Sequence, residues 1–474
     1  MTSARWQKVV LFALLAAAAL AAIAPVRNYD FFWHLATGRW IVEHRALPLS
    51  DPFAVASDRV PWINGEWLFE IVLYGAHRII GTSGMSWVRG LLAALIFGLA
   101  FFWERRDGAS PEGGDAGGPL FYALAYAGAM AMFDVRPSSM AMLFLVIALR
   151  AESTAAQGIN TVLWMNVHPS ALLAPLVAAL RTRRLAPALA SAAALLVNPF
   201  GIRGILAPIE LTLFARSGQF VNAEWLPSPI LVFPLLYLCV LIAIVACATT
   251  PERRAQWWRI VLLMLFAYLA VRHVRNQGLF FAAFPILVTP MVRAIPRAWG
   301  YVASAIAIAF IALRTDHRLG VAPERFPVQA VARLQATGLQ GNIYNADQFG
   351  GLLIHAFYPQ RRALTDGRNE LYRTFIPEYA RARRDERAWR ALLSKYRIDL
   401  AVEEYTPPLP VTDAITHQTR AMPASLAFWP RTKWALIGYD RAAMLFARRD
   451  AFPREVIEKW ELKGVVPDAV RSER

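Results

Sequence analysis

Long apolar stretches separated by short polar turns fill the chain as far as Leu313 and stop there. The first stretch, Val9 to Pro25, follows Arg5 and Lys8 and lacks a small-residue cleavage site leading into a soluble domain. This pattern is typical of a signal anchor whose amino terminus stays in the cytoplasm. Further apolar runs lie at about 81–102, 119–133, 138–149, 159–165 with 171–180, 185–197, 229–248, 260–271, 279–292 and 299–313.

These runs predict about eleven membrane crossings. An odd number places the carboxyl-terminal region opposite the amino terminus, in the periplasm if the membrane is a bacterial inner membrane. Basic residues support this orientation only in part, because Arg181 and Arg183 fall on the predicted cytoplasmic side whereas Arg136 and Arg275 fall outside. Several runs are shorter than the ~20 residues that cross a bilayer. Irregular backbone at that depth needs protein or a wet cavity around it, so we expect a polar cavity that opens outward.

The pattern changes after residue 314, where the density of charged residues roughly doubles. Helical periodicity then alternates with extended segments such as Asn342–Tyr344, Arg362–Leu364 and Ile398–Val402, and Trp434–Tyr439 with Ala442–Ala447 predicts a hairpin. We therefore predict an α-helical polytopic membrane domain over residues 1–314, with about 11 transmembrane helices, and a soluble α/β domain over residues 315–474.

Composition narrows the class of protein. The chain is 57% hydrophobic and 18% charged with a mean hydropathy of +0.36, whereas water-soluble domains have about 25% charged residues. Its formal net charge of +16 predicts membrane lipids rather than nucleic acid as partners, since basic residues of membrane proteins mark cytoplasmic loops and lipid phosphates. Cys239 and Cys247 share one apolar run, which favours packing over metal binding.

Sequence motifs for several enzyme classes are absent. The chain has no Walker loop, no GxGxxG after a strand, no HExxH and no GxSxG. ATP-driven transport, dinucleotide chemistry, zincin proteolysis and serine esterase activity therefore lack their usual support.

The first outer loop, residues 26–80, is far longer than a connector needs to be. Asp30 lies at the mouth of the first crossing, and the mixed aromatic, apolar and charged residues after it predict an interfacial helix. A partly desolvated carboxylate there suits a general base, although Asp30 is an equally good helix N-cap. His34, one turn later on the same face, would orient a substrate, join Asp30 as a metal ligand, or simply be hydrogen-bonded.

Aromatic and acidic residues gather at two places in this loop. Trp33 follows Asp30, and Trp62, Glu66 and Trp67 precede an apolar helix. Aromatic faces beside a carboxylate are typical of sugar-binding sites, so Glu66 is a catalytic candidate and Trp33 and Trp67 are substrate-binding candidates. Interfacial tryptophans also serve as membrane anchors.

Polar residues recur where later crossings should reach the outer side. Ionisable groups at membrane depth are costly, so such a set indicates a functional cavity, although each member alone could cap a helix or pair with a neighbour. Arginine binds phosphate bidentately, which makes the arginines of the set candidates for a lipid phosphate. The set comprises Asp134, Arg136, Asn166, His168, Asn198, Glu224, Arg272, His273, Arg275 and Asn276.

In the carboxyl-terminal region, Asp366 and Arg368 follow a predicted strand. Ligands gather at the carboxyl ends of strands in open α/β sheets. Two interpretations are open: the two side chains pair and fasten the next helix, or they form the roof of an acceptor site in which Arg368 and Tyr372 touch substrate.

Several segments carry a family resemblance: DFFWHLATGRWI, WMNVHPS, LLVNPFG, RNQGLFFAAFP and FGGLLIHAFYPQRRALTDGRNELY. Together with the layout, they resemble a bacterial branch of the GT-C class of membrane glycosyltransferases, which includes protein O-mannosyltransferases, the lipid A aminoarabinose transferase and oligosaccharyltransferase. The resemblance implies inverting transfer of a sugar from a polyprenyl-phosphate-linked donor to a lipid, glycan or protein at the outer face of the inner membrane. Asp30 takes the position of the base.

The resemblance has one departure, and two other functions compete with it. Many members carry an adjacent acidic pair, whereas Phe31 follows Asp30 here, which leaves the need for a divalent cation undecided, with His34 or Glu66 as a second ligand. A transporter or flippase of lipid-linked saccharide would need the same cavity and arginines, but inverted repeats, its usual sequence mark, are not evident. A non-catalytic membrane assembly protein would explain the carboxyl-terminal region but not eleven crossings.

Overall fold

The computed structural model describes residues 3–104, 118–218, 222–250, 253–292, 297–412 and 419–468. The chain forms two compact units. The helical unit comprises Met1–Val26 and Ile63–Gly320, and the α/β unit comprises Arg27–Trp62 and Val321–Arg474. The first part of the outer loop, which we expected to belong to the membrane domain, thus folds with the carboxyl-terminal region.

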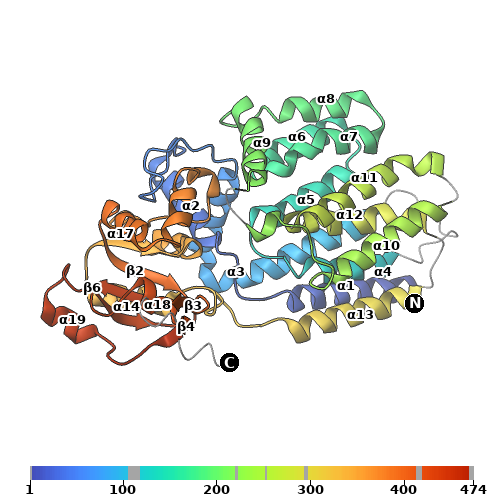
Figure 1. Cartoon of the computed structure of the whole chain (residues 1–474). Helices are drawn as coiled ribbons and strands as arrows, with labels where there is room; N and C mark the ends of the chain where they lie inside the picture. The colour runs from blue at the N-terminus through green and yellow to red at the C-terminus, as the bar shows by residue number, and fades with distance from the viewer. Residues whose placement is uncertain are drawn as a thin grey trace. The chain divides into compact units, whose positions relative to one another are not determined.

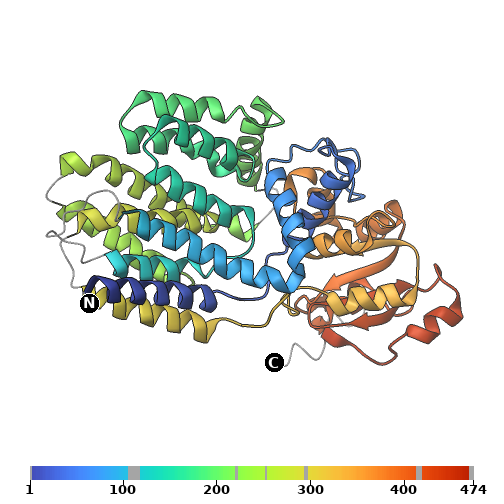
Figure 2. The same ribbon diagram turned by 180° about the vertical axis from the view of Figure 1, so that it is seen from behind.

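The helical unit is a bundle in which α13 lies alongside α4 and α1, and α12 packs against α11, α5 and α4 (Figures 1 and 2). Its helices are α1 (Ser3–Ala21), α3 (Trp67–Glu104), α4 (Gly118–Ala129), α5 (Pro137–Arg150), α6 (Thr154–Met165), α7 (Ala174–Thr182), α8 (Leu185–Ala194), α9 (Ile202–Arg216), α10 (Pro234–Thr249), α11 (Arg253–Arg272), α12 (Gln277–Val288) and α13 (Arg297–Arg314). Short 3₁₀ turns are η1 (Pro169–Leu173), η2 (Ala223–Trp225), η3 (Val274–Asn276) and η4 (Thr289–Met291).

Helix α3 is two helical segments joined at Gly81. The backbone there has φ 66° and ψ −178°, a conformation that glycine adopts at little steric cost and other residues rarely adopt. The apolar run that we predicted to begin at residue 81 therefore starts at this break.

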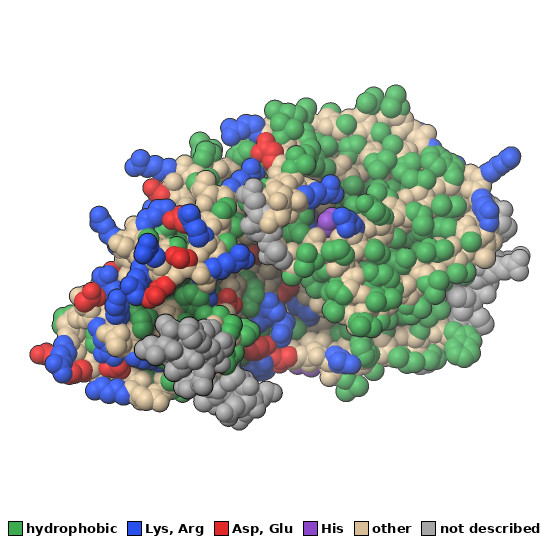
Figure 3. Space-filling model, viewed as in Figure 1, with side chains coloured by type: hydrophobic (Ala, Val, Ile, Leu, Met, Phe, Trp, Pro, Cys, Tyr) green, Lys and Arg blue, Asp and Glu red, His purple; other side chains and the backbone are tan. Residues whose placement is uncertain are grey.

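Two helices of the described residues are long and apolar enough to cross a membrane, Trp67–Phe102 and Arg253–Arg272. The other apolar helices are shorter, at 10–17 residues, so eleven crossings are not confirmed. Large apolar side chains nevertheless stand exposed on this unit, including Ile79, Leu185 and Leu313, which are 84%, 72% and 87% exposed. Figure 3 shows apolar side chains covering its visible face. An apolar surface of this kind is the one that lipid-embedded helices present.

The α/β unit has a four-stranded sheet of order β1-β2-β6-β5, in which β1 pairs parallel with β2 and the other pairs are antiparallel. Helix α14 packs against β5 and β6, and α17 packs against β2. The strands are β1 (Asn342–Asn345), β2 (Ile398–Glu404), β5 (Trp434–Tyr439) and β6 (Ala443–Arg448), with a separate hairpin of β3 (Leu409–Thr412) and β4 (Thr419–Met422). The helices are α2 (Phe31–His44), α14 (Val328–Thr337), α15 (Gly350–Phe357), α16 (Phe375–Ala382), α17 (Glu386–Lys395), α18 (Ala424–Phe428) and α19 (Arg454–Trp460), with 3₁₀ turns η5 (Asp347–Phe349) and η6 (Asn369–Leu371).

The predicted hairpin is confirmed as β5–β6. Asp440 closes it by accepting hydrogen bonds from the backbone N–H groups of Ala442 and Ala443 at 2.8 and 2.9 Å. The predicted extended segment Arg362–Leu364 is not a strand of either sheet. Within it, Ala363 forms an isolated β-bridge with Ala54.

Helix α2 is held inside the α/β unit, where its first eight residues are buried. It packs against α15, and a Cβ atom added to Gly351 would lie 3.0 Å from the backbone nitrogen of Trp33. The Phe32 ring lies edge-on to Phe326 at 5.2 Å. Since protein covers the apolar start of α2, the helix does not need a membrane interface to bury it.

Candidate functional site

Asp30 stands at the N-cap position of α2, but its side chain makes no capping hydrogen bond among the described residues. Its Oδ1 instead accepts a hydrogen bond from the indole Nε1 of Trp33 at 3.1 Å. A Cβ atom built on Gly367 would lie 2.7 Å from the same oxygen. The half-buried carboxylate is therefore held between the first turn of α2 and the backbone of the 365–368 segment.

Beside it, Arg368 forms a buried ionic network. The guanidinium donates from Nε and Nη2 to the two oxygens of Asp366 at 2.8 and 2.5 Å, and its Nη1 lies 2.9 Å from Asp51 Oδ1. Its Cζ is 4.6 Å from the centre of the Trp62 ring. The Tyr372 hydroxyl donates to Asp366 at 2.8 Å. The network joins the 51–62 segment to the 366–372 segment.

Electrostatics fixes the protonation states of this network. Burial alone would lower the pKa of Arg368, but Asp366 and Asp51 raise that pKa well above its ordinary value. Burial and the Asp366 carboxylate raise the pKa of Tyr372 well above 10, so its hydroxyl stays a neutral donor. Arg368 is 2% exposed and Tyr372 is 1% exposed. Because neither offers surface to a ligand, the geometry supports the fastening interpretation rather than direct contact with substrate.

His34 is also buried, 2% exposed, with its ring tilted against Trp33 at 3.6 Å between centroids. The described residues contain no group of three or more His, Cys, Asp or Glu side chains that could hold a metal ion. The residues around Asp30 and His34 thus do not form a ready metal site. Asp347 of η5, which the sequence interpretation missed, accepts a hydrogen bond from Thr365 Oγ1 at 3.2 Å.

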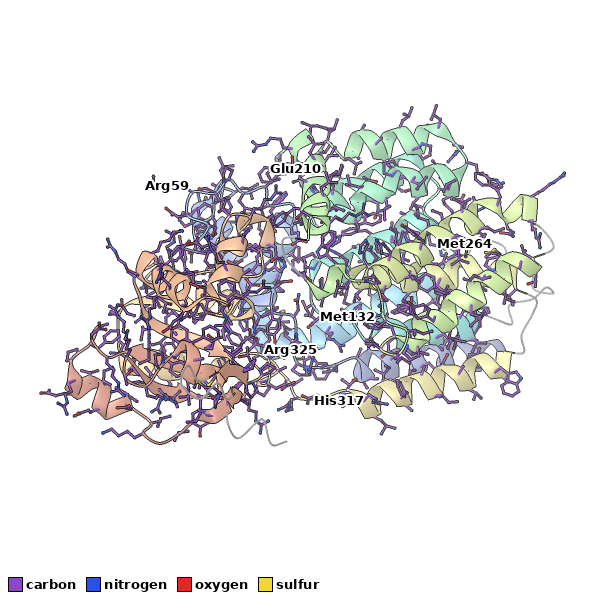
Figure 4. All side chains as sticks on the ribbon, in the orientation of Figure 1. Arg59, Met132, Glu210, Met264, His317 and Arg325 are labelled. Carbon is purple, nitrogen blue, oxygen red and sulfur yellow. The ribbon has the colours of Figure 1, made fainter. Side chains whose placement is uncertain are left out.

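In the helical unit, a pocket of mixed polar and apolar lining forms around the start of α5 (Figure 4, where Met132 of its lining is labelled). Arg136, just before α5, donates two hydrogen bonds to Glu224 of η2, at 2.6 and 2.9 Å. Helices α5 and α12 both begin at this pocket, and helix N-termini favour anions. Its polar lining comprises Arg136, Ser138, Ser139, His168, Arg275 and Asn276.

A second arginine, Arg275, lines the pocket together with Arg136. Burial tends to raise the pKa of Glu224, but Arg136 overcomes this and the pKa is lowered to about 2. Glu224 is therefore ionised and balances the charge of Arg136. Arg275 adds a second guanidinium, whose Cζ lies 4.5 Å from the centre of the Trp225 ring, and its charge also helps to lower the pKa of Glu224.

Other predicted site residues of the helical unit lie neither in this lining nor beside Arg136. The indole nitrogen of Trp67 donates to Asn166 Oδ1 at 2.8 Å, and Asn166 Nδ2 donates to two backbone carbonyls, so this pair fastens helices. Glu66 lies half-buried just before α3, and Arg272 is exposed at the end of α11. The structure thus gathers Arg136, His168, Glu224, Arg275 and Asn276 in the helical unit, and Asp30, Trp33, His34, Asp366 and Arg368 in the α/β unit.

Several buried acids, Asp51 and Glu70 among them, escaped the sequence interpretation. Asp51 accepts from the backbone N–H groups of Phe53 and Ala54 and from the Ser57 hydroxyl. Glu70, fully buried in the first turn of α3, accepts from Asn64 at 2.6 Å. The sequence signal that could have identified Glu70 was a carboxylate inside the apolar run WLFEIVLY. The sequence around Asp51 offered no comparable signal.

No family model and no curated protein matches the chain. Solved structures of the Archaeoglobus fulgidus oligosaccharyltransferase do match. The apo form has 10% sequence identity and a TM-score of 0.54, with 83% of this chain and 69% of that chain covered. The form tethered to an acceptor peptide has 10% identity and a TM-score of 0.54, with 88% and 74% covered. The complex with an inhibitory peptide and a dolichol-phosphate has 9% identity and a TM-score of 0.51, with 88% and 74% covered. At this identity the likeness shows the fold alone: the chain has an oligosaccharyltransferase-like fold.

Proposed function

We propose that the protein is a membrane glycosyltransferase that moves a sugar from a polyprenyl-phosphate-linked donor to a lipid, glycan or protein acceptor. The observation that carries the proposal is the carboxylate of Asp30, held by Trp33 against Gly367 in a chain of oligosaccharyltransferase-like fold. Structures of that archaeal enzyme have been solved with a dolichol-phosphate and with a tethered acceptor peptide, which supports a lipid-phosphate carrier for this chain too.

In the proposed reaction Asp30 is the general base. It takes the proton of the acceptor nucleophile while that atom bonds to the anomeric carbon of the sugar, and the bond from this carbon to the carrier phosphate breaks with its electrons going to the phosphate. Displacement from the opposite side inverts the anomeric centre. The hydrogen bond from Trp33 Nε1 to Asp30 Oδ1 orients the carboxylate.

The pocket of the helical unit is proposed to bind the carrier phosphate. Arg275, the serines at the start of α5 and the N-termini of α5 and α12 present donors and positive potential to an anion. Such groups attract and hold a phosphate anion. We place the protein in a bacterial inner membrane, with its amino terminus in the cytoplasm and its α/β unit in the periplasm.

The test starts by finding the product. Glycolipids and glycoproteins of a deletion strain and of its complemented parent are compared by mass spectrometry, and transfer by the purified protein is then measured with the donor so identified. General bases typically contribute 10²–10⁴-fold, so Asp30→Asn should lower kcat by at least about 10²-fold with an unchanged melting temperature. Asp58→Asn, an exposed aspartate of the same segment, is the matched control. Full transfer by Asp30→Asn would refute the proposal, and lipid flipping without transfer would favour a flippase.

A further inference from the structure

A small groove lies between helices α2 and α15 of the α/β unit, away from the Asp30 end of α2. It is lined by Ala36, Arg39, Trp40, Glu43, Ile354, His355 and Tyr358. Arg39 and Glu43 are 43% and 47% exposed at their side chains, and Trp40 and Tyr358 are half-buried. The groove thus offers two aromatic rings and a charged pair to solvent.

The lining is held in place before any ligand arrives. Arg39 Nε donates to Glu43 Oε1 at 2.8 Å. His44 stacks on Trp40 at 4.1 Å with 10° between the ring planes, and the Tyr358 ring lies edge-on to Phe53 at 4.9 Å. Fixed side chains lose little conformational entropy when a ligand binds, which favours affinity even at a small site.

This combination of groups has a defined chemical preference. Tryptophan and tyrosine present flat apolar surface with a polar edge, which suits the C–H face of a pyranose ring. A guanidinium and a carboxylate side by side can donate to and accept from adjacent hydroxyls. A phosphate would be repelled by Glu43, and a purely apolar ligand would leave the Arg39–Glu43 pair without water.

We propose that this groove binds a pyranose unit of a saccharide, and, resting on the function proposed above, that this unit lies several sugars away from the one being transferred. Ten residues separate Asp30 from Trp40, most of them along α2, which corresponds to about 15 Å at 1.5 Å per residue. A single sugar does not cover that distance, whereas a short oligosaccharide does. A saccharide that occupies this groove while it reacts at Asp30 would therefore be an oligosaccharide.

The test measures binding first, independently of transfer. Full-length protein in nanodiscs is applied to a glycan array, and the glycans that bind are then titrated in solution. Trp40→Ala and Glu43→Gln should each weaken binding at least 10-fold, and Trp40→Phe, which keeps a ring, should weaken it less than Trp40→Ala. Tyr439→Ala, which removes an exposed ring elsewhere on the unit (47% exposed), should leave binding unchanged. Melting temperatures verify that each variant is folded.

Two results would overturn this inference: no glycan bound by the wild type, or glycan binding by folded Trp40→Ala and Glu43→Gln equal to that of the wild type. Binding of a peptide rather than a glycan at these residues would also contradict it. The two proposals fail separately. If Asp30→Asn abolishes transfer but Trp40→Ala leaves both glycan binding and donor-length preference intact, the groove does not bind the saccharide and the proposed function stands. If Trp40→Ala abolishes glycan binding while Asp30→Asn retains full transfer, the groove binds the saccharide and Asp30 is not the base.

Discussion

Replacing Arg368 by methionine should destabilise the α/β unit, because the change leaves two buried carboxylates without their cation. The Arg368 side chain is fully buried, as are those of Asp366 and Asp51. Removing one partner of a buried ion pair costs about 3–5 kcal/mol. Asp51 keeps two backbone N–H donors and the Ser57 hydroxyl, and Asp366 keeps the Tyr372 hydroxyl. These remaining donors place the expected loss at the lower end, about 3 kcal/mol.

The assay is thermal unfolding of the full-length protein, followed by tryptophan fluorescence, to which Trp62 beside Arg368 contributes. For a unit of this size each kcal/mol shifts the midpoint by about 2–4 °C, so the melting temperature should fall by about 6–12 °C. The matched control is Arg390→Met. Arg390 is 64% exposed and pairs with Glu386 one turn away on α17, an arrangement worth under about 0.5 kcal/mol. Hydrogen exchange should quicken in residues 51–62 of Arg368→Met and not in the control.

Equal melting temperatures for Arg368→Met and Arg390→Met would refute the energetic argument. A raised KM for the acceptor with unchanged stability would refute the fastening interpretation as well, and would return Arg368 to the acceptor site. A fall in kcat that parallels the loss of stability, with KM unchanged, is the outcome expected of a residue that holds the Asp30 surroundings in place.

Three further predictions address the two candidate sites. Gly367→Ala should lower kcat about 10²-fold without loss of folding, because its Cβ would lie 2.7 Å from the Asp30 carboxylate and displace the base; transfer kinetics measure this. Arg275→Ala should raise KM for the lipid-linked donor about 10-fold, since a charge-assisted hydrogen bond contributes about 1.5 kcal/mol or more, whereas exposed Arg272→Ala should not; donor titrations compare them. Because the pKa of Glu224 is lowered to about 2, its stabilising contribution is full above about pH 4.5 and is lost as the pH falls toward 2; unfolding midpoints against pH should show this loss in the wild type and not in Glu224→Gln.

Locally encoded elements of the α/β unit were predictable from the sequence. Short apolar runs on both sides of Asp440 predicted β5 and β6, because strand composition and turn chemistry act within a few residues. Helix α17 follows Asp385, whose side chain caps it by accepting from the Ala388 N–H at 2.6 Å. The β3–β4 hairpin was missed, since Pro410 and the polar residues of these strands give no apolar alternation.

Contacts between distant segments were not predictable in the same way. Asp51 and Arg368 are separated by more than 300 residues, and no local pattern connects an aspartate in a turn to an arginine in another loop. The predicted pairing of Asp366 with Arg368 was accessible because the two residues are neighbours in sequence. Their burial was not, because it depends on Trp62 and Phe53 of the first outer loop packing over the guanidinium.

Close backbone approach explains why glycines recur in the segment FGGLLIHAFYPQRRALTDGR. A Cβ atom on Gly350 would lie 2.0 Å from the Thr365 carbonyl oxygen, one on Gly351 would lie 3.0 Å from the Trp33 nitrogen, and one on Gly367 would meet Asp30 at 2.7 Å. Each glycine therefore removes a side chain where α2, α15 or the 365–368 segment touch. The Gly351 and Gly367 contacts bring DFFW of the first loop against FGG and TDGR of the carboxyl-terminal region, and the Gly350 contact brings FGG against TDGR. The environment of Asp30 is thus built jointly by two segments far apart in the chain, and changes in either segment should alter the carboxylate without touching it chemically.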